Sequence, residues 1–124
     1  MKLRIRGDTV RLRLSQSETV QLSEQGAVSD AVEFAPDSRL EYRLEVGEVE
    51  SPEARYASDR IVVTISKEAM GRWLDPTEVA IEAEQPLDPE HSLRVLIEKD
   101  FACLTPREGE DESDSFPNPQ AGSG

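Results

Sequence analysis

Apolar and polar residues alternate in short runs along the first half of the chain, a pattern typical of half-buried β-strands. Residues 2–6 and 10–14 each alternate cations with aliphatic side chains, and Gly7-Asp8 lies between the two runs. A glycine at the first central position suits a type II′ turn, whose twist matches that of paired strands. The pattern therefore predicts a hairpin over residues 2–14, and further strands over 28–34 and 39–46.

A short helix is predicted between these two strand pairs. Ser15 is followed three residues later by Glu18, the spacing of a capping box, and Gly26 provides a stop signal. Only Val20 and Leu22 are clearly apolar in this segment. Such a helix depends on packing against the sheet for its stability.

The same order of elements returns after a polar break at residues 48–53. Alternation and turn signals predict strands over 55–57, 61–65, 79–83 and 93–97, with a turn at 86–89. Between them, Ser66 is a predicted N-cap for a helix over 67–74, in which Met70, Trp73 and Leu74 recur at helical spacing. We expect Trp73 to be buried against the sheet.

The repeated order indicates an internal duplication of residues 2–46 and 53–99. A shift of 51 residues (from Arg4 to Arg55), followed by a two-residue insertion, aligns the two halves. The aligned pairs are Arg4/Arg55, Asp8/Asp59, Ser15/Ser66, Val28/Val79, Glu33/Glu84, Asp37/Asp88 and, after the insertion, Leu40/Leu93 and Glu45/Glu98. We predict an α+β fold, a mainly antiparallel sheet or barrel-like body built from two tandem ββαββ units with pseudo-twofold symmetry.

An acidic tail is predicted to follow a single domain of residues 1–105. Within residues 106–124, five acids fall in seven residues, and Pro, Ser and Gly follow. Such a segment lacks the apolar surface to fold alone. Two alternatives stay open: the tail lies along the body with its acids near the cations of the first hairpin, or it is solvated.

Acidic residues outnumber basic ones, 26 to 14, which gives the 124-residue chain a formal net charge of −12. Such a surface repels nucleic acid and anionic membranes, so neither is an expected partner. The single cysteine, Cys103, rules out a disulfide within the chain and fits a reducing compartment. No run approaches the ~18 apolar residues of a membrane helix, and no signal peptide is recognised. We therefore expect a cytoplasmic protein.

The predicted hairpin gathers five of the 14 cations on one face. With Gly7-Asp8 as the turn, the side chains that share this face are Lys2, Arg4, Arg6, Arg11 and Arg13. Like charges opposite one another destabilise a strand pair, so anions should face them. These anions are carboxylates of the chain itself (Glu33, Glu41 and Glu45, or the tail), or they belong to a phosphate-bearing ligand. The five cations are the candidate anion-binding site.

No catalytic constellation, metal-ligand spacing or cofactor motif is recognised. His91 is the only histidine, and one cysteine with one histidine lacks the spaced ligand pairs of a zinc site. Alternating glutamates and eight strands resemble the triphosphate tunnel metalloenzymes, but residues 2–6 replace the Glu-x-Glu-x-Lys strand that holds their metal. The chain is therefore predicted to be a non-catalytic binding or interaction protein, with a protein partner or a small anionic ligand. The alternative is a phosphate-binding protein or a metal-dependent phosphohydrolase.

Segments near both ends of the chain support a family resemblance. Lys-Leu-Arg-Ile-Arg-Gly and Arg-Leu-Arg-Leu-Ser-Gln-Ser-Glu stand near the N-terminus, and Lys-Asp-Phe-Ala-Cys-Leu and Phe-Pro-Asn-Pro near the C-terminus. Together they resemble a family of small bacterial proteins of unknown function. The resemblance implies a bacterial, cytosolic setting and carries no activity, cofactor or catalytic residue.

Overall fold

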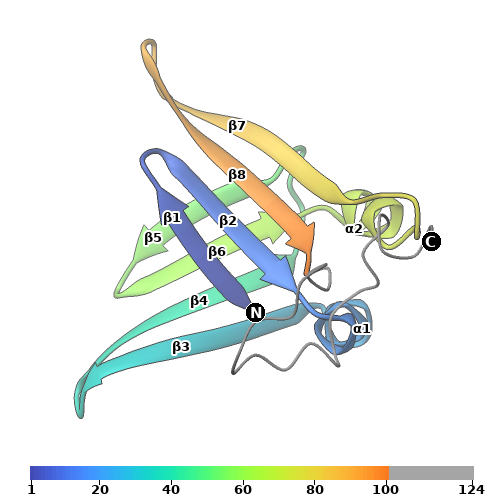
Figure 1. Cartoon of the computed structure of the whole chain (residues 1–124). Coiled ribbons are helices and arrows are strands. Elements are labelled where there is room, and N and C mark those ends of the chain that lie inside the picture. Colours follow the sequence, from blue (N-terminus) through green and yellow to red (C-terminus); the bar gives the residue numbers. More distant parts are fainter. Residues whose placement is uncertain (101–124) are drawn as a thin grey trace, which may run out of the picture.

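The computed structural model describes residues 1–100, which form eight strands and two helices (Figure 1). The first unit contains β1 (Lys2–Arg6), β2 (Thr9–Leu14), α1 (Gln16–Gln25), β3 (Ala27–Ala35) and β4 (Ser38–Val46). The second contains β5 (Glu53–Ala57), β6 (Arg60–Ile65), α2 (Lys67–Trp73), β7 (Ala80–Asp88) and β8 (His91–Lys99). The α+β fold and the two ββαββ units are thus confirmed, while the tail and Cys103 lie outside the described residues.

Each of the two sheets combines a hairpin of one unit with a hairpin of the other. The strand orders are β1-β2-β8-β7 and β3-β4-β6-β5. The four hairpins are antiparallel, whereas β2 pairs with β8 and β4 with β6 in parallel, so both sheets are mixed. In each four-stranded sheet the outermost strands do not pair with each other, so neither sheet closes and the barrel-like alternative is not realised.

Equivalent hydrogen bonds show how closely the two units match. The Arg94 N–H donates to the Asp8 carbonyl at 2.8 Å, and the Glu41 N–H donates to the Asp59 carbonyl at 3.1 Å. The strand registers are also equivalent: Ala27 lies opposite Glu45 as Ala80 lies opposite Glu98. The two halves therefore interact through a reciprocal pair of contacts, as pseudo-twofold symmetry requires.

The registers also correct the predicted alignment within the second hairpins. Val28 corresponds to Ile81, whereas the sequence comparison had matched it with Val79. The insertion thus precedes β7 and lies in the linker after α2, so the predicted matches Glu33/Glu84 and Asp37/Asp88 are wrong too. An ungapped comparison places an insertion late when the residues after it agree by chance.

Both helices begin at the predicted serines. The Ser15 Oγ accepts the Glu18 N–H at 3.4 Å, the Glu18 carboxylate accepts the Ser15 N–H at 2.9 Å, and the complete capping box is confirmed. The Ser66 Oγ accepts the Ala69 N–H at 3.0 Å. α1 ends at Gly26, whose φ of +80° is a left-handed conformation that glycine adopts without a side-chain clash.

A buried lysine forms hydrogen bonds to the backbone of the longer linker that follows α2. Lys99 is only 5% exposed, and its Nζ donates to the carbonyls of Asp75 at 2.8 Å and Glu78 at 2.7 Å. Burial lowers the pKa of the Lys99 ammonium below its ordinary value. The equivalent position in the first unit is Val46, which follows from the matched registers. The lysine therefore satisfies backbone acceptors that only the second unit has.

The core lies between the inner faces of the two sheets and is mostly aliphatic. Its fully buried members include Leu12, Leu14, Leu44, Val63, Ile65, Val95 and Ile97. Leu22 of α1 and Trp73 of α2 occupy equivalent positions and are also buried; Trp73 is 1% exposed, as predicted. The ends of the β3–β4 and β7–β8 hairpins lie apart from the helices (Figure 1), and Phe34 near one tip is 71% exposed.

The second hairpins are longer than the sequence pattern indicates. β7 continues to Asp88 and β8 begins at His91, so residues 86–88 of the predicted turn belong to a strand. Pairing continues past the core because ladder hydrogen bonds do not require buried side chains. The alternation of apolar residues, by contrast, reports only the part of a strand that packs.

Replacing either N-cap serine by alanine should cost about 1 kcal/mol of unfolding free energy, because a helix N–H loses its acceptor. Ser15→Ala and Ser66→Ala can be compared by urea denaturation. Equal losses would indicate that the caps contribute alike in the two units. A change below a few tenths of a kcal/mol in both variants would contradict the role of the caps.

Trp73→Ala is expected to destabilise the protein by roughly 3–5 kcal/mol, because it removes the largest fully buried side chain from the core. Trp73→Phe keeps most of the apolar volume and serves as the control, with a smaller loss. Thermal or urea unfolding measured by circular dichroism tests both. A loss below 1 kcal/mol for Trp73→Ala would mean that this part of the core is poorly packed.

Candidate functional site

The β1–β2 hairpin has the predicted register and presents the predicted cations on one face. Lys2 lies opposite Arg13, Arg4 opposite Arg11, and Arg6 opposite Thr9. Gly7, in the turn, has a φ of +53°, as the first position of a type II′ turn requires. Side chains alternate along a strand, so these residues point away from the core that Leu12 and Leu14 enter.

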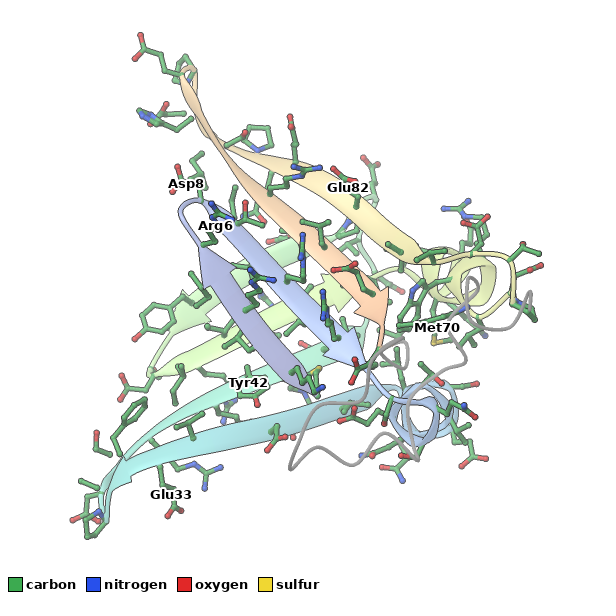
Figure 2. The ribbon with its side chains drawn as sticks, in the orientation of Figure 1. Arg6, Asp8, Glu33, Tyr42, Met70 and Glu82 are labelled. Atoms are coloured by element: carbon green, nitrogen blue, oxygen red, sulfur yellow. The ribbon has the colours of Figure 1, made fainter. Side chains whose placement is uncertain are left out.

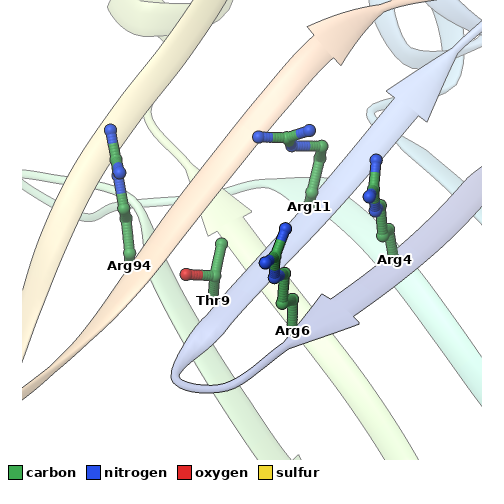
Figure 3. A pocket seen from close by; sticks show the side chains of 5 residues that line it. All are labelled: Arg4, Arg6, Thr9, Arg11 and Arg94. Carbon is green, nitrogen blue, oxygen red and sulfur yellow. The ribbon is translucent and has the colours of Figure 1, made fainter.

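A sixth cation, Arg94, joins this face from the second unit. β8 lies beside β2 with Thr9 opposite Arg94. A hollow of about 210 Å³ is lined by Arg4, Arg6, Thr9, Arg11 and Arg94. Figure 3 shows that the four guanidinium groups project to the same side of the sheet. Sequence reasoning missed Arg94 because no local signal connects it with the first hairpin.

We call the surface formed by these cations the basic face; its members are Lys2, Arg4, Arg6, Arg11, Arg13 and Arg94. Carboxylates of the second unit lie against part of it. Glu98 Oε1 lies 2.8 Å from Arg11 Nε and 4.0 Å from Arg13 Nε. Lys2 Nζ lies 3.0 Å from Asp100 Oδ2. The predicted intramolecular partners Glu33, Glu41 and Glu45 are wrong, since the strands that carry them belong to the other sheet. The prediction assumed that the strands that come next along the chain, β3 and β4, are also the neighbours of the first hairpin in space.

Arg4 and Arg6 have no ion-pair partner within residues 1–100. Arg4 also lies directly opposite Arg11, a like-charge pair that destabilises the hairpin. The contact of Arg11 with Glu98 is close, but its buried Nε makes no hydrogen bond to any described residue. Arg4 and Arg6 therefore keep N–H groups that can donate hydrogen bonds to a bound anion.

Arg94 has a partner on the neighbouring strand. Its Nε donates to Glu82 Oε1 at 2.8 Å, and its Nη2 donates to the same oxygen. Both side chains are about half exposed, 52% for Arg94 and 50% for Glu82. Figure 2 shows Glu82 on β7 and Arg6 near the tip of the first hairpin. An exposed pair of this kind is worth little, so an incoming anion can replace the carboxylate at small cost.

The duplicated unit provides an internal comparison for the hollow. The matched registers place five other residues at the positions of Arg4, Arg6, Thr9, Arg11 and Arg94. They are Arg55, Ala57, Arg60, Val62 and Glu41 respectively. Two arginines of the hollow thus correspond to apolar residues, and a third to a carboxylate. The scaffold is shared, but the concentration of positive charge belongs to one sheet alone.

Ion pairs involve three arginines of the other sheet, whereas Arg39 of β4 has none within residues 1–100. Arg55 lies 3.8 Å from Glu45, Arg43 lies 3.6 Å from Glu45, and Arg60 lies 3.4 Å from Glu41. Most of the positive charge on the outer face of the β3–β4–β6–β5 sheet is therefore compensated internally. Among the described residues, a hollow lined by four arginines is found on the β1–β2–β8 face alone.

The other candidate chemistry is not brought together. His91 Nδ1 lies 2.9 Å from Asp88 at the exposed tip of the β7–β8 hairpin. The N–H of Glu90 and the ring of His91 lower the pKa of the Asp88 carboxyl. Within residues 1–100, no three His, Cys, Asp or Glu side chains gather as a metal-binding group. The open sheets also provide no tunnel like that of the triphosphate tunnel metalloenzymes.

The model of a protein family of unknown function matches residues 1–120 of the chain. The chain belongs to this family, DUF7009. The predicted resemblance to a family of unknown function is confirmed. Searches of curated proteins and of solved structures found no significant match. Neither helix of the DUF7009 fold in residues 1–100 has the length and apolar content needed to cross a membrane.

Arg4→Gln should stabilise this DUF7009 protein at low salt by about 0.2–1 kcal/mol, because it removes the repulsion between Arg4 and Arg11. The gain should shrink at high salt, which screens exposed charges. Urea unfolding at the two salt concentrations measures both effects.

The matched control is Arg55→Gln, which changes the equivalent position in the second unit. Arg55 has an ion pair with Glu45, so its loss should leave stability unchanged or lower it slightly. If Arg4→Gln destabilises the protein as much as Arg55→Gln does, the repulsion in the first hairpin is not significant.

Proposed function

We propose that this protein is a non-catalytic binding protein whose outer β1–β2–β8 face takes a phosphate-bearing anion. The observation that carries the proposal is the hollow with four arginines, in which Arg4 and Arg6 lack an ion-pair partner within residues 1–100. Guanidinium groups match phosphate oxygens in geometry and form strong charge-assisted hydrogen bonds with them. Lys2 and Arg13 extend the positive face beyond the hollow.

The net charge makes this local concentration of cations significant. The chain carries −12 overall, yet six of its 14 cations gather on a single sheet face: Lys2, Arg4, Arg6, Arg11, Arg13 and Arg94. A region of one sign raises the local concentration of opposite charge and speeds association. The cost of repulsion between Arg4 and Arg11 in the free protein is offset when an anion binds between them.

The proposal includes the cellular location of the protein and the division of its chain into a domain and a tail. A single cysteine fits a reducing compartment, so we propose a cytoplasmic location, and the family resemblance of the terminal segments favours a bacterial source. We keep residues 1–105 as the domain and 106–124 as the acidic tail. The alternative of a metal-dependent phosphohydrolase loses support, because its closed architecture is not formed.

Phosphate, pyrophosphate and tripolyphosphate are expected to raise the melting temperature, because a ligand that binds only the native state stabilises it. The increase should be absent in the double variant Arg4→Gln/Arg6→Gln and retained in Arg55→Gln, which changes the other sheet. Potassium chloride at matched ionic strength corrects for screening. A flat response to all three anions would refute the proposal.

A further inference from the structure

The basic face offers an anion little besides charge. Its described residues on β1, β2 and β8 are arginines, Lys2, Thr9, Ser92, Leu96 and Glu98, and none of them is aromatic. Proteins that bind single-stranded nucleic acid stack bases on aromatic side chains, and protein interfaces are commonly anchored by Trp and Tyr together with Arg. Leu96, the one large apolar residue, is only 8% exposed. The face therefore offers no aromatic platform on which a base could stack and no pocket for an apolar peptide side chain.

The dimensions of the face limit the length of the anion. Residues two apart on a strand are separated by about 6.8 Å, so Lys2 to Arg6 spans roughly 13–14 Å. β1 and β8 lie on either side of β2, which places their backbones about 10 Å apart. Glu98 on β8 and Glu82 on β7 present negative charge at one side of this area, and a long polyanion would meet it. A short chain of linked phosphates fits this span better than one phosphate or a polymer.

Arg94 lies at the border between the basic area and these carboxylates. It is held by Glu82 through two hydrogen bonds to one oxygen, while Thr9 separates it from Arg6 across the sheet. A phosphate that reaches Arg94 takes the place of the Glu82 carboxylate. Glu82 is then an internal competitor of the ligand, and its removal should strengthen binding.

From these observations we infer that the ligand is a short, base-free oligophosphate that bridges Arg4 and Arg6 of β1 to Arg94 of β8 by displacing Glu82. The inference rests on the proposed anion-binding function and specifies its ligand class and a further binding residue. The site is then composite, because two of its arginines come from the hairpin of one unit and Arg94 comes from the other.

Isothermal titration calorimetry with the full chain, at constant ionic strength and without divalent cations, tests this inference. The probes are tripolyphosphate, orthophosphate, ATP, an oligothymidylate and a poly-aspartate peptide. Tripolyphosphate is expected to bind at least tenfold more tightly than orthophosphate and than the two polymers. ATP should bind no more tightly than tripolyphosphate, since the face has no group that would recognise its base.

Two variants test the bridge to β8. Arg94→Gln should weaken tripolyphosphate binding about tenfold or more, the loss expected for a charge-assisted hydrogen bond, and should leave orthophosphate binding within about twofold. Glu82→Gln should strengthen tripolyphosphate binding severalfold. Arg60→Gln, which removes an arginine from the other sheet, is the control and should change nothing. Circular dichroism confirms that each variant is folded.

The outcomes separate this inference from the proposed function. If no anion binds the wild-type protein, both are wrong. If anions bind but Arg94→Gln has no effect on tripolyphosphate, or the oligothymidylate or peptide binds as tightly, anion binding stands and the inference is overturned. Tight tripolyphosphate binding that depends on Arg94 and increases in Glu82→Gln supports it.

Discussion

The parallel ladder between β2 and β8 joins the first unit to the second, and the ladder between β4 and β6 joins them again. An isolated two-stranded hairpin is marginally stable in water. Neither unit supplies more than two neighbouring strands to a sheet, so each depends on the other for a four-stranded sheet with a buried face. The two copies therefore fold as one body, and the core forms only when both ladders are in place.

This exchange of hairpins also creates the candidate site. Arg94 lies far from Arg4 in the chain, and only the pairing of Thr9 with Arg94 brings it to the basic face. The same pairing brings Glu98 to Arg11 and, through β7, Glu82 to Arg94. Both the positive charge and its partial compensation are therefore products of the interface between the units.

Comparison of the two units distinguishes the positions that form the core from the positions that form the basic face. Apart from Val46, which corresponds to the buried Lys99, positions that enter the core mostly stay apolar in both copies, such as Leu22 and Trp73, because burial stabilises them in either unit. Positions on the outer faces diverge, and Glu41 stands where the second unit has Arg94. Ion pairs on an exposed sheet face contribute little to stability, so these positions can change without loss of the fold. The repulsion between Arg4 and Arg11 is a cost that packing does not explain.

The order of strands and helices could be predicted from the sequence alone. So could the helix caps at Ser15 and Ser66 and the register of the first hairpin. These features depend on contacts within about a dozen residues, where alternation, capping and turn chemistry act directly. The pairing of distant strands and the packing of the whole core establish which hairpins share a sheet and where the insertion lies. They also explain why Lys99 is buried and why Arg94 belongs to the candidate site. Strand pairing between distant segments leaves no local pattern, because any strand with an apolar face can pair with many others, and the choice among them depends on how the whole core packs.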